Sequence, residues 1–236
     1  MFDAPTPLDL RWQMFGTRIV VTPWFWLTLA LLGWPYFEMG GPLLLFLWVL
    51  AGFLSILLHE FGHVLMGRVF RNEGSILMTA FCGLALGTTD GLGPWKRIAV
   101  SAAGPAIQLL FFGLLTGVVW NFPNFVADLP ENFGILFGFL LFINFWWAIL
   151  NLLPIYPLDG GQILCDFLEY FMRDRGRYIG HGISFALATA LAIFFFTRGN
   201  GGYFAFFLVL NAITNFQKMQ EYTNRFHSHD DYPWTR

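Results

Sequence analysis

The stretch Met39–Leu58 reads MGGPLLLFLWVLAGFLSILL, and the sequence His59-Glu60-Phe61-Gly62-His63 follows it directly. The stretch contains no Asp, Glu, Lys or Arg, and about 20 apolar residues in a helix are enough to cross the hydrocarbon core of a bilayer. A charge at the centre of a membrane helix costs about 2.5–3.5 kcal/mol on insertion scales, so such residues generally face a polar interior and mark function. We therefore predict a membrane helix that ends in a functional site. The alternative is that His59, Glu60 and His63 are simply polar residues at the membrane–water interface.

The composition also indicates a membrane protein. Of the 236 residues, 56% are apolar, 19% aromatic and only 12% charged, whereas a soluble domain carries about 25% charged residues. The lipid bilayer is therefore the expected surroundings, with Trp side chains available for its interfaces. The net charge is −2 and the sequence has no basic patch, which argues against nucleic acid as a partner.

Six uncharged stretches are long enough to cross the bilayer once each. They are Ile19–Phe37, Met39–Leu58, Ile98–Ala127, Asn132–Leu158, Tyr178–Thr197 and Gly199–Gln217. Six crossings place both termini on one side, and the positive-inside rule then assigns every Lys and Arg except Arg198 to the cytoplasmic side. We predict an all-α polytopic membrane protein with six transmembrane helices and both termini in the cytoplasm.

One apolar segment does not fit a crossing. Gly74–Thr89 (GSILMTAFCGLALGTT) is uncharged, but it is 16 residues long, is interrupted by glycines and has basic flanks on both sides. It is predicted to be a small interfacial β-hairpin or a re-entrant segment. The expected organisation is a single integral-membrane domain at residues 1–223, with a core at about 42–165, and a polar cytoplasmic tail at 224–236.

The residues after the second stretch form an H-E-x-x-H pattern. On a helix, residues i and i+4 share a face, so the imidazoles of His59 and His63 can bind the same metal ion. Glu60 then lies close to the open metal position, where it can accept a proton from a bound water molecule. The pattern predicts one Zn²⁺ per chain, with Glu60 as the general base and the metal site towards the cytoplasmic side.

Zinc needs a further protein ligand, and the candidate is Asp159 in the segment Asn151–Gly161 (NLLPIYPLDGG). Asp159 follows the fourth predicted span, so it lies on the same predicted side of the membrane as His59 and His63. The alternative is a proline-rich helix exit in which the Asp caps the helix that follows.

The pair HEFGH and NLLPIYPLDGG resembles the site-2 protease family, the intramembrane zinc metalloproteases of peptidase family M50. A third stretch, Ser101–Gln108 (SAAGPAIQ), resembles the small-residue AGP motif on the next core helix of that family. The resemblance implies these site residues: zinc ligands His59, His63 and Asp159, general base Glu60, and Asn151 to hold substrate backbone or stabilise the oxyanion. Asn144 lies seven residues before Asn151 on the same helical face and is a weaker candidate for assisting in this role. The role of Gln108 stays open, because the family commonly has Asn there.

The resemblance implies a metalloendopeptidase that hydrolyses peptide bonds in or near the transmembrane segments of membrane-anchored proteins, in regulated intramembrane proteolysis. It also implies that an extended substrate pairs with the Gly74–Thr89 segment as an added strand. Two alternatives belong to other classes. A zinc transporter has no need of Glu60 beside its first ligand, and a non-proteolytic binder of membrane proteins tends to lose a ligand or the base.

Overall fold

The structure, a computed structural model, describes residues 7–80, 83–199 and 202–230. The chain divides into two compact units. The first comprises Met1–Gly91 and Ala102–Ile149, and the second comprises Leu92–Ser101 and Leu150–Arg236.

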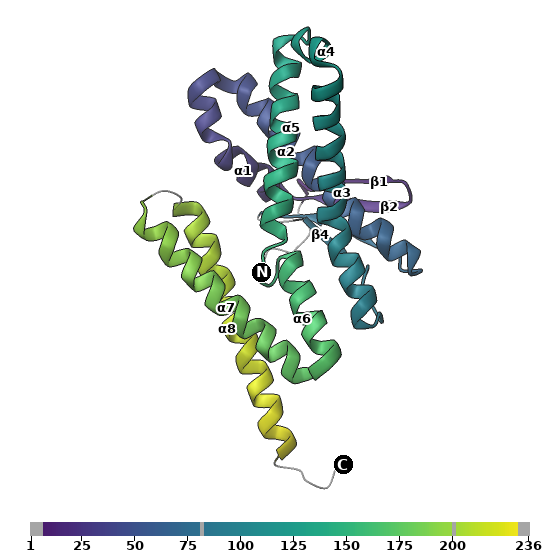
Figure 1. Cartoon of the computed structure of the whole chain (residues 1–236), viewed down its shortest axis with the longest axis vertical. Helices are drawn as coiled ribbons and strands as arrows, with labels where there is room; N and C mark the ends of the chain where they lie inside the picture. Colours follow the sequence, from purple (N-terminus) through teal and green to yellow (C-terminus); the bar gives the residue numbers. More distant parts are fainter. Residues whose placement is uncertain (1–6, 81–82, 200–201, 231–236) are drawn as a thin grey trace. The chain divides into compact units, whose positions relative to one another are not determined.

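The first unit is built on long apolar helices (Figure 1). Its helices are α1 (Pro23–Leu32), α2 (Trp34–Val69), most of α3 (Pro94–Asn121), the short α4 (Pro123–Ala127) and nearly all of α5 (Glu131–Asn151). Helix α2 contains the predicted second span and is kinked at Gly40 and Gly41, where Gly41 has a φ of 70° that L side chains rarely adopt. Beyond the kink, α2 continues through His59 and His63 to Val69.

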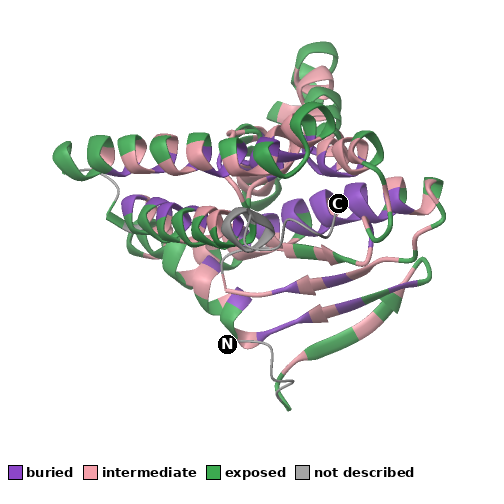
Figure 2. Ribbon diagram, turned by 90° about the horizontal axis from the view of Figure 1, so that it is seen from below, coloured by how far each residue is buried: buried purple, intermediate pink, exposed green. Residues whose placement is uncertain are grey.

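A β-sheet lies beside the C-terminal part of α2. Its strand order is β1 (Leu10–Met14), β2 (Thr17–Val21), β3 (Ser75–Met78) and β4 (Gly83–Leu86). The inner strands β2 and β3 are parallel, with Ile19 opposite Ile76, and they join two antiparallel hairpins. Side chains of these inner strands share a hydrophobic core with Phe61 and Val64 of α2. Figure 2 shows buried residues on the inner strands and mainly intermediate or exposed residues on the edge strands.

The sheet confirms one prediction and corrects another. Strands β3 and β4 form a hairpin within Gly74–Thr89, as predicted, with residues 81–82 outside the described part of the chain. The all-α expectation is wrong for residues 10–21, because they form a second hairpin. The first predicted span includes residues 19–21 instead, and the pairing of β2 with β3, more than 50 residues away in the sequence, is not evident from that segment.

The predicted span Ile19–Phe37 is not a single transmembrane helix. Its first residues end strand β2, and α1 has 10 residues, fewer than the roughly 20 that a crossing takes. Trp48 of α2 donates a hydrogen bond from its indole Nε1 to the carbonyl oxygen of Leu29 at 3.1 Å, so α1 packs along α2. Strand β2 runs parallel to β3, and β3 follows α2 in the sequence. The chain must therefore turn back between β2 and β3, and α1 forms part of this connection.

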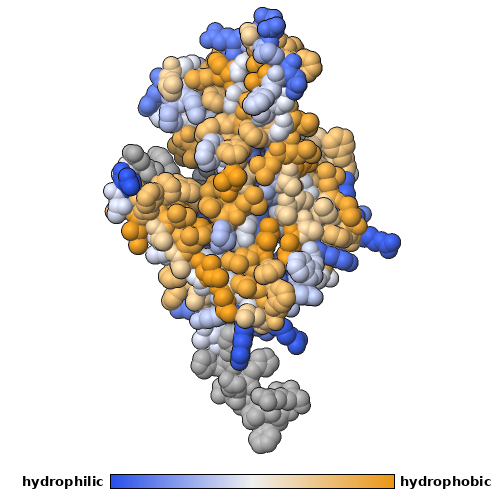
Figure 3. Space-filling view, viewed as in Figure 1, coloured by the Kyte–Doolittle hydropathy of each residue, from blue (hydrophilic) through white to orange (hydrophobic). Residues whose placement is uncertain are grey.

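Among the described residues, four helices are long and apolar enough to cross a membrane: α2, α3, α5 and α7 (Asp174–Thr197). The six-span prediction is thus reduced to four candidates. The stretch Gly199–Gln217 falls largely in α8 (Gly202–Asp230), where Asn211, Asn215 and Gln217 lower the mean hydropathy of the segment. Figure 3 shows hydrophobic residues over much of the face in view, as expected of a surface in contact with lipid.

The second unit contains α6 (Asp159–Met172), α7 and α8. Helices α7 and α8 lie side by side (Figure 1) and bury a cluster of small and branched residues, among them Ala188, Ala192 and Leu208. The predicted tail is helical at its start, because α8 continues to Asp230; residues 231–236 lie outside the described part.

A cluster of ion pairs joins three segments of the second unit. Arg97, at the start of α3, and Arg177 of α7 each bind Asp166 of α6, at 2.9 Å and 2.8 Å. Both guanidinium groups also contact the carboxylate of Glu169. Since the Asp166 side chain is only 6% exposed, loss of either arginine would leave a buried charge less compensated.

Candidate metal centre

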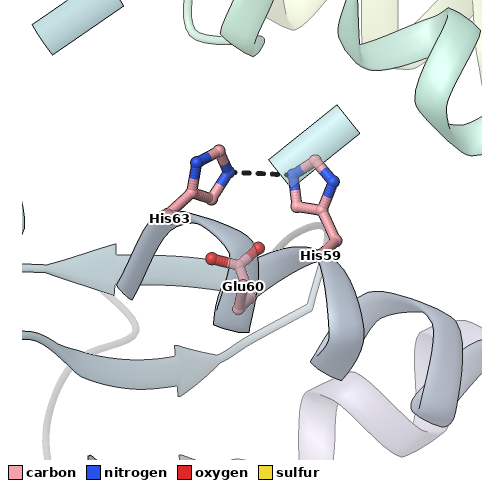
Figure 4. Close-up of side chains that lie close together, drawn as sticks. All are labelled: His59, Glu60 and His63. Carbon is pink, nitrogen blue, oxygen red and sulfur yellow. Dashed lines mark hydrogen bonds between the residues drawn. The ribbon is translucent and has the colours of Figure 1, made fainter. Parts of the chain in front are cut away.

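The predicted metal-binding residues His59, Glu60 and His63 lie together on α2 (Figure 4). Their ligand atoms are all within 4.8 Å of one another, and the three residues are 3%, 4% and 7% exposed. The Nε2 atoms of the two imidazoles face each other at 3.0 Å. The i, i+4 spacing of the histidines thus places both rings on one face of the helix, as predicted from the sequence.

Two glycines allow α2 and α3 to approach closely at this point. A Cβ on Gly62 of α2 would lie 2.5 Å from the carbonyl oxygen of Ala103. A Cβ on Gly104 of α3 would lie 2.5 Å from Cε1 of the His63 ring and 2.9 Å from Cε1 of His59. The glycine of the AGP stretch therefore leaves the space that both imidazoles occupy.

Gln108 contacts the site from α3. Its Oε1 lies 2.9 Å from Nδ1 of His59, and its Nε2 donates to the backbone oxygen of Ser55 at 3.1 Å. The side chain is fully buried. The sequence left the role of this residue open, although its position four residues after Gly104 places it on the same face of α3.

Strand β4 reaches the site at its first residue. A Cβ on Gly83 would lie 2.5 Å from the carboxyl carbon of Glu60. Because β4 is an edge strand of the sheet, one of its sides is not paired with another described strand. An edge strand therefore begins beside the carboxylate that the sequence predicts to be the general base.

Asn144 of α5 contacts α2 one helical turn before the histidines. Its Nδ2 donates to Oγ of Ser55 at 2.9 Å and to the backbone oxygen of Leu140 at 2.8 Å. The side chain is fully buried. Both donor hydrogens of the amide are thus used in packing between and within helices. The assisting role considered from the sequence stays a prediction.

The other predicted site residues belong to the second unit. Asn151 is the last residue of α5 and Asp159 is the first residue of α6, and both are buried. Their roles as oxyanion partner and third zinc ligand stay predictions. The glycines that follow Asp159 are tightly enclosed, since a Cβ on Gly161 would lie 2.5 Å from Cα of Tyr156.

The loop between Asn151 and Asp159 is held by polar side chains of α7 and α8. The backbone N–H of Tyr156 donates to Oγ of Ser184 at 3.1 Å, and Nδ2 of Asn215 donates to the carbonyl oxygen of Tyr156 at 2.6 Å. The Oδ1 atom of Asn215 lies 2.9 Å from Nδ1 of His181. These buried residues hold both backbone polar groups of Tyr156 in place, and no sequence motif had indicated them.

The cluster on α2 fits a zinc ion. Zinc takes imidazole nitrogens at about 2.0–2.1 Å in a tetrahedral arrangement, so two such ligands lie about 3.3 Å apart. The 3.0 Å between the Nε2 atoms of His59 and His63 is close to this separation. The space beside the rings exists because residue 104 is glycine.

Comparisons with known sequences find related zinc metalloproteases. A model of peptidase family M50 matches residues 127–195. A protein of Synechocystis sp. named "Putative zinc metalloprotease" is 35% identical over 163 residues, which are 64% of this chain and 42% of that protein. A zinc metalloprotease of Methanocaldococcus jannaschii is 28% identical over 118 residues, or 50% of this chain and 33% of the relative. The matches thus span less than half the length of each relative.

Comparison of structures shows a shared fold. A site-2 protease from Methanocaldococcus jannaschii superimposes with a TM-score of 0.66 at 22% sequence identity. The similarity covers 89% of this chain and 95% of that one.

Proposed function

We propose that this chain is a zinc-dependent endopeptidase of the membrane and a member of peptidase family M50, the site-2 protease family, whose model matches residues 127–195. The observation that carries the proposal is the buried cluster of His59, Glu60 and His63 within a helix that can span a bilayer. A buried carboxylate beside two imidazoles in such a helix is costly, and it indicates a functional site. His59 and His63 would hold the zinc, with Asp159 as the third ligand.

The proposed reaction is hydrolysis of a peptide bond. Zinc, when bound, lowers the pKa of a coordinated water molecule to about 7 and so supplies a nucleophile. Glu60 accepts the proton of this water and then donates it to the leaving amine. The neutral amide of Asn151 donates a hydrogen bond to the oxyanion, because an amide can stabilise negative charge without repelling a cation.

The substrates we propose are membrane-anchored proteins, cut in or near their transmembrane segments. A helical segment must unwind before cleavage, because its carbonyl groups are already hydrogen-bonded. An added strand on the edge of β4 would replace those bonds with main-chain hydrogen bonds that tolerate varied side chains. The start of β4 at Gly83, beside Glu60, supports this placement of the scissile bond.

We also propose an orientation for the membrane. Arg68 and Arg71 lie at the C-terminal end of α2, whereas Arg198 lies at the C-terminal end of α7. The positive-inside rule therefore places the end of α2 that carries His63 towards the cytoplasm. Strands β1 and β2 belong on the same side, because they share a sheet with β3, which follows α2.

The test compares fragments of membrane proteins in cells that produce the native chain with those in cells that produce Glu60→Gln, together with the zinc content of both purified proteins. We expect fragments cut at membrane segments with the native chain alone, and about one zinc in each protein. Equal fragment profiles with zinc present in both proteins would contradict proteolysis. Zinc uptake into vesicles that survives the substitution would instead favour the transporter alternative, and retained capture of membrane proteins without cleavage would favour the binder.

A further inference from the structure

We propose that Gln108 is a positioning residue that fixes which nitrogen of His59 is available to a metal ion. The inference rests on the proposed function in one respect, since it takes His59 to be a zinc ligand.

The placement of Gln108 follows from the crossing of α2 and α3. His59 and His63 are four residues apart on α2, and Gly104 and Gln108 are four residues apart on α3. Gly104 lies against the ring of His63, and Gln108 lies against His59. One turn of α3 thus runs antiparallel to one turn of α2, with Gly104 giving room for both rings and the Gln108 amide bonding His59.

The backbone of α2 determines which end of the Gln108 amide faces His59. The carbonyl oxygen of Ser55 can only accept a hydrogen bond, so the amide group 3.1 Å from it is the NH₂ group. The carbonyl end of Gln108 is then the atom 2.9 Å from Nδ1 of His59. An amide oxygen can only accept, so Nδ1 of the imidazole carries the hydrogen.

This hydrogen bond selects one tautomer of the neutral His59 ring. With the hydrogen on Nδ1, the lone pair is on Nε2, which faces Nε2 of His63 at 3.0 Å. A metal-binding histidine commonly donates its other ring N–H to a carbonyl or carboxylate, which fixes its orientation and raises its basicity as a ligand. Gln108 supplies this partner from a neighbouring helix.

Burial makes the contribution of Gln108 difficult to replace. The side chain is fully buried, and its amide bonds two groups of α2 at once. Asn is shorter by one methylene and could not reach both groups from the same backbone position. An apolar residue would leave Nδ1 of His59 without this acceptor.

The experiment compares the purified native chain with Gln108→Met, Gln108→Asn and the control Asn144→Leu. Asn144 is a matched control, because it is an equally buried amide that also bonds Ser55, and its hydrogen bonds go to Ser55 and Leu140 and not to either histidine. Zinc affinity is measured by competition with a chelator. The position of the ring hydrogen of His59 is measured by ¹⁵N NMR of the zinc-free protein, with the signal assigned through His59→Asn.

We expect Gln108→Met to weaken zinc binding about 10–100-fold and to redistribute the His59 hydrogen between both ring nitrogens. Gln108→Asn should fall between Gln108→Met and the native protein, and Asn144→Leu should keep the native zinc affinity and the Nδ1 hydrogen. Native zinc affinity in Gln108→Met, or an equal loss in Asn144→Leu, would overturn the proposal. If the native chain binds no zinc, the proposed function fails, whereas a Nδ1 hydrogen that depends on Gln108 would still establish the bond.

Discussion

Gly83 lies against the carboxyl group of Glu60, so closely that a Cβ at residue 83 would come within 2.5 Å of the carboxyl carbon. Atoms that are not bonded do not approach to this distance, so a side chain here would displace either Glu60 or the start of β4. The lack of a side chain at the first residue of the edge strand thus leaves room for the carboxylate of the proposed general base.

We therefore expect Gly83→Ala to retain zinc and lose activity. A misplacement of about 1 Å in a reacting group can reduce the rate about 100-fold, and Glu60 is not proposed as a ligand. The measurement is turnover of an identified substrate together with zinc content. Gly113→Ala is the control, because a Cβ at that residue has no atom within 4 Å. Equal activity of the two variants would show that β4 does not restrain Glu60.

Asp159→Ala should lower both zinc affinity and proteolysis if Asp159 is the third ligand. The competing interpretation is a helix-capping role, and the chain offers a direct control for it. Asp174 begins α7 as Asp159 begins α6, but Asp174 is exposed. We expect Asp174→Ala to keep the native zinc affinity, which chelator competition can measure. A loss of stability in Asp159→Ala with unchanged zinc affinity would support capping alone.

The polar contacts around Tyr156 should stabilise the loop that leads to Asp159. Asn215→Leu removes the donor to the carbonyl oxygen of Tyr156 and leaves that half-buried group without this hydrogen bond, and a typical hydrogen bond contributes about 0.5–1.5 kcal/mol. We expect a lower thermal unfolding midpoint and weaker zinc binding. Thr214→Val is the control, because the Thr214 hydroxyl bonds only within α8 in the described contacts. Equal unfolding midpoints of the two variants would contradict the stabilisation of this loop by Asn215.

Cys165 should be unreactive in the folded protein at moderately alkaline pH. Burial raises the pKa of its thiol from 9.0 to about 12, although nearby Arg177 opposes the shift. A raised pKa in the folded state favours the neutral thiol, so its contribution to stability is complete below pH 9 and is lost as the pH rises towards 12.

The measurement is the rate of alkylation by iodoacetamide between pH 8 and about 10, in a Cys82→Ser background. We expect slow alkylation of the folded protein and fast alkylation after denaturation. A folded rate that rises with an apparent pKa near 9 would show that the thiol is accessible and unshifted.

Much of the candidate site could be predicted because its information is local. The spacing of His59 and His63 defines one helix face whatever surrounds the helix, and the apolar run before them requires a membrane. The hairpin within Gly74–Thr89 was also predictable, because its strands are adjacent in the sequence and their pairing is short-range.

The predicted spans were less reliable, because length and lack of charge do not distinguish one helix from a strand followed by a short helix. The segment Ile19–Phe37 satisfies both criteria, yet it contains the end of β2, the whole of α1 and a turn at Gly33. The pairing of β2 with β3 decided this, and such pairing depends on residues that the segment itself does not contain.

The sequence by itself determined that the chain has a bilayer-spanning body and an H-E-x-x-H helix within it, since both follow from short-range periodicity and composition. Only the tertiary structure decided the surroundings of that helix. It brought Gly104 and Gln108 of α3 against the imidazoles and Gly83 of β4 against Glu60. These contacts join residues 23 to 49 positions apart, so they depend on how helices and strands pack, which no local pattern specifies.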